Sequence, residues 1–353
     1  MMKYIYLSIF FCIALGISGC LSNKTVDDPD IEHITVDLDS SKDFMNEIAN
    51  MQVTKLTEDD DFSPGDFSKT QWKGDTLFIL DSFKSKGLYV YGPDGNLIKS
   101  YREYGHGPKE FLGISDFLIK DNEIVLLDTY GSPNRIILDS ELNFLRKEEA
   151  EDKASHFFED SDGGIWYDKG NIAYDMNEDK LIYYKDGVRK GVLEIPENLK
   201  NITFSNPNSF CLLKNGSIGY LPALEPYVYE CKNGEAKKLF MLDFGEKWPI
   251  MDKKASATHP LQLMKDIVDK GDIFGLDMFS DNDHIVFTFR CKDLFYILIV
   301  DQNIPDNTRL LHLDEAEMDN FGSFLSIHNG SLIFGQDSRI VSVDLKQNEN
   351  TIP

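Results

Sequence analysis

The chain has 353 residues, of which 36 are basic and 60 acidic, and its net charge at pH 7 is -24. The acidic excess is spread along the chain, so it argues for solubility and against nucleic acid as a partner. No glycine-, serine- or proline-rich linker divides the chain, and a ring of repeats can use this length as one unit.

The N-terminal segment differs in kind from the rest. Lys3 precedes an apolar run, residues 5–17, which is too short to span a bilayer comfortably and is typical of a secretory signal. The run ends in Ile17-Ser18-Gly19-Cys20, which resembles the lipobox of bacterial lipoproteins. The resemblance implies that residues 1–19 are a signal peptide and that Cys20 becomes an acylated N-terminus, carrying lipid such as palmitate. An ordinary secretory signal, or a helical anchor with an incidental cysteine, is the alternative.

Residues 20–32 are polar, include Pro29 and predict a tether. More than one acyl chain holds a soluble domain firmly on a membrane, because each buried CH₂ adds roughly 0.8 kcal/mol. The expected location is therefore the cell envelope, as an outer membrane lipoprotein that is periplasmic or surface-exposed. The membrane is the expected partner through this lipid.

Two alternating apolar pieces follow the tether, at residues 34–38 and 53–56, and the segment between them has some helical periodicity. Residues 59–65 resemble a calcium loop, but Pro64 stands where glycine belongs and Thr70 where the bidentate glutamate belongs. We therefore expect no cofactor, with calcium or another divalent metal as the alternative.

Residues 75–148 contain two copies of one repeated unit. Each copy has an apolar strand that ends in aspartate, at Asp81 and Asp128, followed by a polar turn and two more strands. A repeat of roughly 45 residues made of short strands is typical of propeller blades, because one small sheet cannot bury both of its faces alone. We expect both aspartates to accept hydrogen bonds from the turns that follow them.

Four looser units follow, with hairpins that begin near residues 164, 216, 284 and 331. Turns such as Asn233-Gly234 between apolar runs are strong hairpin signals, since both residues tolerate positive φ. With the two clear copies, the count of units is six. The sixth unit lacks a fourth strand, which predicts that residues 34–38 or 53–56 close the ring.

The predicted fold class is all-β, a six-bladed β-propeller over residues 33–348 with four-stranded antiparallel blades and an N-terminal strand that closes the last blade. The strand pattern stops between residues 245 and 279, where Pro260 begins an amphipathic stretch. One helical insertion is therefore expected around residues 249–272. This insertion either covers an exposed apolar edge or carries function.

Residues 104–111, which read Tyr-Gly-His-Gly-Pro-Lys-Glu-Phe, and the later run at residues 134–137 are similar to the NHL-type repeat. The glycine-rich loop also resembles the GxGPGEF signature of six-bladed propeller lipoproteins of anaerobic diderm bacteria, with Lys109 in place of a glycine. The resemblance implies a fold and a location. The residues of this loop with an expected structural role are Gly105, Gly107, Pro108, Glu110 and Phe111.

The sequence contains no GxSxG elbow, no HExxH pair, no phosphate loop and no dinucleotide fingerprint, so no catalytic residue is assigned. NHL-type propellers include metal-dependent lyases with ligands from several blades. The resemblance therefore leaves a lyase or hydrolase at the channel mouth as the alternative function, to be judged by whether histidines and carboxylates converge there. The cysteines at 211, 231 and 291 lack metal-site spacing and are expected to be free thiols.

A binding or interaction module for a peptide, a glycan fragment or a partner protein is favoured over an enzyme. In a propeller, the connections between blades and those between second and third strands share one face, and here nearly all variation in loop length falls on that face. Aromatic and charged side chains on these loops are the types that anchor ligands. The expected ligand-binding residues are Lys84, Tyr104, His106, Tyr130, Glu225, Trp248, Arg290 and Lys292.

Overall fold

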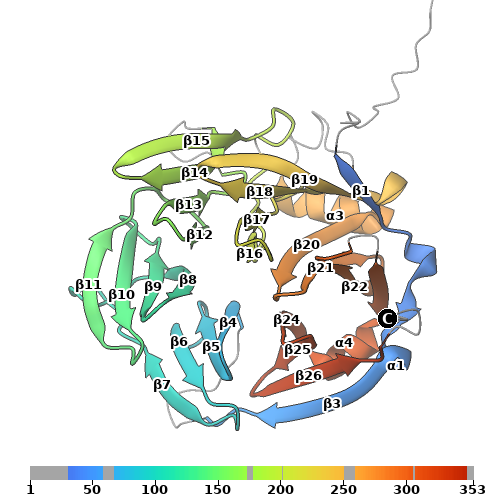
Figure 1. The fold of residues 1–353 in the computed structure, drawn as a ribbon, viewed down its shortest axis with the longest axis horizontal. Coiled ribbons are helices and arrows are strands. Elements are labelled where there is room, and N and C mark those ends of the chain that lie inside the picture. Colours follow the sequence, from blue (N-terminus) through green and yellow to red (C-terminus); the bar gives the residue numbers. More distant parts are fainter. Residues whose placement is uncertain are drawn as a thin grey trace, which may run out of the picture. The chain divides into compact units, whose positions relative to one another are not determined.

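The computed structural model describes residues 31–58, 67–172, 178–200, 202–249, 259–304 and 307–347. In the compact unit that begins at Glu32, six β-sheets lie around a common axis, which confirms the six-bladed β-propeller (Figure 1). From β4 onward, the strands of each sheet follow chain order from the axis to the rim. Across the described ranges, no helix has both the length and the apolar character needed to cross a membrane.

The first three blades each contain four antiparallel strands. Blade 1 consists of β4 (Lys69–Lys73), β5 (Thr76–Asp81), β6 (Gly87–Tyr91) and β7 (Leu97–Tyr101). Blade 2 consists of β8 (Ile114–Lys120), β9 (Glu123–Asp128), β10 (Asn134–Asp139) and β11 (Phe144–Glu149). Blade 3 consists of β12 (His156–Glu159), β13 (Ile165–Asp168), β14 (Asp179–Lys185) and β15 (Val188–Glu194).

The last three blades repeat this order. Blade 4 contains β16 (Phe210–Leu212), β17 (Ile218–Tyr220), β18 (Tyr227–Lys232) and β19 (Glu235–Asp243). Blade 5 contains β20 (Ile273–Ser280), β21 (His284–Cys291), β22 (Leu294–Asp301) and β23 (Thr308–Leu313). Blade 6 contains β24 (Ser323–His328), β25 (Ser331–Gln336) and β26 (Arg339–Leu345) from this end of the chain.

The N-terminal region adds one strand to each of these three blades. β3 (Ile48–Lys55) pairs antiparallel with β26 and completes blade 6, so the ring closes through the second of the two expected strands. β1 (Glu32–Thr35) and β2 (Lys42–Asp43) run parallel to β19 and β23, as fifth strands beyond the four expected in blades 4 and 5. They cover rim edges that would otherwise be free to pair with another chain.

Helices occupy connections and the N-terminal region. Two are short 3-10 turns, η1 (Leu38–Ser40) and η2 (Gly245–Lys247), and α1 (Phe44–Glu47) lies between β2 and β3. α3 (Pro260–Lys270) connects blades 4 and 5 and is the expected helical insertion. α4 (Glu315–Phe321) connects blades 5 and 6, and strand periodicity did not indicate it, although Asp314 and Glu317 form a capping box that is readable in the sequence.

The predicted hairpins are the second and third strands of the blades. Some innermost strands are harder to identify in the sequence, because they are not apolar runs of ordinary strand length. β4 is Lys-Thr-Gln-Trp-Lys, and β16 is only three residues long. Both face the axis, where alternating polar side chains are tolerated.

Apolar side chains fill the spaces between neighbouring blades. Six buried clusters each join one pair of adjacent blades, and the cluster between blades 1 and 2 includes Leu80, Leu126 and Phe111. The cysteines at 211, 231 and 291 are free and buried in β16, β18 and β21, as expected. Burial raises the pKa of the Cys211 thiol to about 12, which makes it unreactive.

The two faces of the ring differ. Because neighbouring strands are antiparallel, the connections between blades and those between second and third strands lie on one face, which we call the loop face. The turns between first and second strands and between third and fourth strands lie on the opposite, turn face. The long connections, including residues 102–113 and the one that contains α3, are on the loop face.

Candidate functional site

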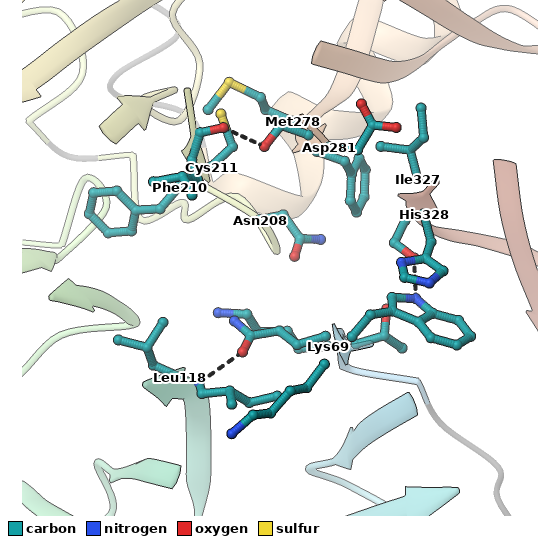
Figure 2. A pocket seen from close by; sticks show the side chains of 18 of the residues that line it. Lys69, Leu118, Asn208, Phe210, Cys211, Met278, Asp281, Ile327 and His328 are labelled. Atoms are coloured by element: carbon teal, nitrogen blue, oxygen red, sulfur yellow. Dashed lines mark hydrogen bonds between the residues drawn. The ribbon is translucent and has the colours of Figure 1, made fainter. Parts of the chain in front are cut away.

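A cavity of about 570 Å³ lies on the propeller axis (Figure 2). All six innermost strands, β4, β8, β12, β16, β20 and β24, contribute side chains to its lining. Asp121, Asn282 and Asn329, in turns between first and second strands, also line it, so the cavity reaches the turn face. Lys69 and Asn208, at the start of innermost strands, mark its other end. We call this the axial cavity.

One wall of the axial cavity is apolar. Phe158 and Phe210 come from blades 3 and 4, and their ring centroids are 6.1 Å apart. Leu212 is 52% exposed although it belongs to an innermost strand. Met278 and Leu118 complete this wall. An apolar wall near unpaired strand edges can hold the hydrophobic part of a ligand while polar groups fix its orientation.

A stacked aromatic pair lies on another side of the cavity. The rings of Trp72 in β4 and His328 in β24 have centroids 4.3 Å apart and an interplanar angle of 11°. Trp72 Nε1 donates to Ser326 Oγ at 3.2 Å, which fixes the indole between blades 6 and 1. Burial lowers the pKa of His328, so its imidazole is neutral near pH 7.

A buried ionic cluster closes the end near Lys69. Lys69 Nζ lies 2.5 Å from Asp116 Oδ1, and His156 Nδ1 lies 3.5 Å from Asp116 Oδ2. The backbone N–H of Phe157 also donates to Asp116 Oδ2 at 3.0 Å. Burial alone would raise the pKa of Asp116, but the charges of Lys69 and His156 hold it below its ordinary value. The carboxylate therefore connects blades 1, 2 and 3 at the axis.

Asp277 and Asn208 form the opposite polar part of this end. Burial raises the pKa of Asp277 to about 7, and the backbone N–H of Asn208 donates to its Oδ1 at 3.3 Å. Figure 2 shows the Asn208 amide extending into the open space of the cavity, opposite Lys69. None of the described residues hydrogen-bonds this side-chain amide, so it offers a ligand one acceptor and two donors.

At the turn face, Asp281 joins blades 5 and 6 beside the cavity. Its carboxylate accepts from the backbone N–H groups of His284 at 2.8 Å and Gly330 at 2.9 Å. Burial opposes ionisation, but these hydrogen bonds and the His284 ring outweigh it and lower the pKa of Asp281 to about 2. Asp281 is therefore an ionised carboxylate at this mouth.

None of the eight expected ligand-binding residues lines the axial cavity. Lys84, Tyr104, His106 and Tyr130 are exposed together on the loop face of blades 1 and 2. Lys292 is also exposed, in the turn after β21. The prediction placed its residues on the loops that vary in length, whereas the cavity is lined by innermost strands and short turns.

The other expected ligand-binding residues make internal contacts. Glu225 pairs with Lys180, and both side chains are largely buried between blades 3 and 4. Trp248 stacks on Phe244 with centroids 5.5 Å apart. Arg290 lies over the Phe295 ring and lines a separate cavity of about 360 Å³ on the loop face.

The glycine-rich loop is fastened from within by Glu110. The backbone N–H of Gly107 donates to Glu110 Oε2 at 2.6 Å, and a Cβ on Gly105 would come 2.2 Å from the same oxygen. Phe111 is buried between blades 1 and 2, and Pro108 is exposed at the tip. These contacts give the loop one rigid conformation.

The two repeat aspartates play different parts. Asp81 accepts from the backbone N–H groups of Phe83, Lys84 and Ser85, in the turn that follows it, as expected. Asp128 does not cap its own turn. It accepts instead from Leu112 and Gly113 at the end of the glycine-rich loop, because that loop returns beside β9.

No group of three histidine, cysteine, aspartate or glutamate side chains with metal-binding geometry occurs among the residues that the structure describes. His106 is exposed in a loop, His259 caps α3, and His284 bonds Asp281. The histidines considered for a lyase are thus spread over separate elements. The stretch that resembles a calcium loop, and Cys20, lie outside the described residues.

A family model named DUF5128 and described as a 6-bladed beta-propeller matches residues 23–323. No curated protein matches the chain. A protein from Bacteroides fragilis NCTC 9343, described as exported, is similar in structure, with a TM-score of 0.71 and 13% identity over 89% of this chain and 100% of that chain.

A member of the duf4221 family from Bacteroides vulgatus ATCC 8482 has a TM-score of 0.54 and 8% identity, over 85% of this chain and 97% of that chain. At these identities the two likenesses show the fold alone, because one propeller scaffold carries many unrelated functions.

Proposed function

We propose that this chain, which belongs to the DUF5128 family of six-bladed β-propellers, is a binding module that holds a ligand in its axial cavity. The observation that carries the proposal is the lining, which combines an apolar wall with polar groups from five of the six blades. Its volume of about 570 Å³ falls within the range of small-molecule sites, roughly 300 to 1,000 Å³. A short peptide or a glycan fragment fits this volume.

Rigid positioning supports binding at this site. The Asp116 cluster and the Trp72–His328 stack fasten cavity walls across blade boundaries. A ligand that enters therefore meets groups already in place, which lowers the entropic cost of binding. The Asn208 amide supplies directional hydrogen bonds, and the aromatic pair offers an apolar surface.

The proposed location is the cell envelope, with Cys20 as the lipid-bearing N-terminus. Its support is the apolar run that ends at the lipobox-like residues 17–20, together with the loop that resembles the signature of propeller lipoproteins. The description of the Bacteroides fragilis protein as exported agrees with this location. A ligand taken from the envelope would reach the axial cavity through the turn face.

The experiment compares two variants, Asn208→Trp and Lys237→Trp. Lys237 is exposed on β19, so its variant is the control. A tryptophan at 208 places an indole in the cavity, whereas one at 237 lies on the rim. Peptides and oligosaccharides are screened against the detergent-purified chain by thermal shift, and active compounds are confirmed by isothermal titration calorimetry.

We expect compounds that stabilise the wild type to stabilise Lys237→Trp equally and to have no effect on Asn208→Trp. The melting temperatures of the unliganded variants control for folding. Equal stabilisation of both variants by every active compound would show that the ligand does not occupy the axial cavity.

A further inference from the structure

We infer that the loop face of blades 1 and 2 is a second binding site, separate from the axial cavity, and that its ligand is an anionic polysaccharide. Eight exposed side chains from three neighbouring loops define this surface, which we call the basic aromatic patch. They are Phe83, Lys84, Lys86, Arg102, Tyr104, His106, Lys109 and Tyr130.

The charge of the patch is opposite to that of the molecule. Residues 82–87 and 102–113 contain four basic and two acidic residues, in a chain whose net charge is -24. One of the two acids, Glu110, directs its carboxylate to the backbone N–H of Gly107 inside the loop. The outer surface is therefore locally positive and attracts an anion that the rest of the chain repels.

Three aromatic rings stand exposed among these cations. Phe83 is 76% exposed, Tyr130 72% and Tyr104 54%. Burying such rings against a ligand removes apolar surface from water, and exposed clusters of this kind mark interaction sites. Their exposed sides are available for contact with a ligand.

The rings of Tyr104 and Tyr130 have fixed supports. The Tyr104 ring packs edge-on against Phe111 with centroids 6.1 Å apart, and Lys86 Nζ lies 4.5 Å from the Tyr104 centroid. Tyr130 packs across Gly113, where a Cβ would come 2.4 Å from its ring, so only glycine fits beneath it. Ordered rings lose little entropy when a ligand binds.

Hydrogen bonds connect the three loops. Ser82 Oγ donates to the Ile114 carbonyl at 2.9 Å, and the Thr129 N–H donates to the Gly113 carbonyl at 3.1 Å. Asp81 and Asp128 each accept backbone N–H groups of these loops. The patch is thus one preorganised surface and not three independent turns.

The composition of the patch favours a polysaccharide over the other anionic partners. Three exposed lysines, Lys84, Lys86 and Lys109, stand among the rings, whereas the centre of a protein interface is depleted of lysine. A sugar ring offers C–H groups to an aromatic face, and its carboxylate or sulfate offers oxygens to lysine and arginine. Nucleic acid shares this pattern and is tested as the competitor.

The test measures binding of the detergent-purified full chain to polygalacturonate and dextran sulfate, with neutral dextran as the uncharged control. Two triple variants carry the same change of charge. One replaces Lys84, Lys86 and Lys109 with glutamine in the patch. The other replaces Lys190, Lys232 and Lys237, which are exposed on β15, β18 and β19 of blades 3 and 4.

We expect the patch variant to bind the acidic polysaccharides about tenfold more weakly than wild type, and the control variant to change less than about twofold. Tyr130→Ala is expected to weaken binding about fivefold without altering the charge. Higher salt should weaken wild-type binding, because exposed charges are screened.

Equal losses in the two triple variants, or no binding by the wild type, would overturn the inference. Binding of single-stranded oligothymidine at least as tight, with the same dependence on Lys84, Lys86 and Lys109, would also overturn it in favour of nucleic acid. Asn208→Trp should bind the polysaccharides as the wild type does. A result that contradicts polysaccharide binding at the patch is therefore distinguishable from one that contradicts ligand binding in the axial cavity.

Discussion

At the scale of single residues, Asp277 makes the stability of the fold sensitive to pH. Burial raises the pKa of Asp277 to about 7 in the folded chain, whereas an unfolded aspartate ionises near pH 4. Between these values the folded chain holds a proton that the unfolded chain has lost. The contribution of this group to stability therefore falls as pH rises from about 4 to 7, and it stays constant above that range.

Asp277→Asn tests this expectation. Asparagine keeps an oxygen to accept from the Asn208 N–H and cannot ionise. The free energy of unfolding, measured in urea, should rise for the variant relative to wild type between pH 5 and pH 8, by about 2 to 3 kcal/mol, because the wild type loses about 1.4 kcal/mol per pH unit from pH 5 to 7. The exposed Asp319→Asn is the control and should follow the wild type. If the difference in unfolding free energy between wild type and Asp277→Asn does not change with pH, the raised pKa of Asp277 is contradicted.

The sequence predicted residue roles best where a residue acts within one turn or one loop. Asp81 caps the turn that follows it, a local relation that a short motif can reveal. The axial cavity is different, because Lys69, Asn208 and His328 meet only after the ring has closed. Each innermost strand supplies a few lining residues with no common spacing, so no sequence pattern marks the set.

At the scale of elements, the N-terminal segment fastens the last blades. Phe44 opens α1 and is fully buried, with ring centroids 5.3 Å from Phe321 in α4 and 5.6 Å from Phe334 in β25. The residue after it, Met45, is 49% exposed. One short helix thus places one side chain in the core between blades 5 and 6 and its neighbour in solvent.

Phe44→Ala should lower the free energy of unfolding by about 3 to 5 kcal/mol, because it removes a buried aromatic ring and leaves a cavity. Met45→Ala should change it by less than about 0.5 kcal/mol and is the matched control. Urea denaturation followed by circular dichroism measures both. Similar small effects for the two variants would show that the segment does not support the ring.

The element pattern was predictable where strands are apolar and turns carry glycine. The second strands of all six blades are apolar and could be recognised in the sequence. Their number predicted the number of blades. The places of β1 and β2 in blades 4 and 5 could not be assigned from sequence, because a parallel rim strand of a few residues is defined by the neighbour it meets. A capping box marks the start of α4. The helix is only seven residues long, so its helical periodicity is too short to be distinguished from the surrounding strand pattern.

At the scale of the whole molecule, each face of the ring carries one of the two proposed sites. The axial cavity reaches the turn face, and the basic aromatic patch lies on the loop face. One ligand can therefore occupy the axis while a polymer lies on the other side. This division follows from the topology, since a propeller places its long connections on one face and its short turns on the other.

The proposed lipid anchor at Cys20 would hold the molecule in the envelope. If Cys20 is the acylated N-terminus, cells labelled with a fatty-acid analogue should yield labelled wild-type protein and unlabelled Cys20→Ala. Cys12→Ala, within the apolar run, should remain labelled, because a cysteine there precedes the expected cleavage site. Cys20→Ala should also leave the membrane fraction if its signal is still cleaved, because each lost CH₂ removes roughly 0.8 kcal/mol of membrane affinity. Equal labelling of the wild type and Cys20→Ala would refute lipidation at this residue and favour an ordinary signal or a helical anchor.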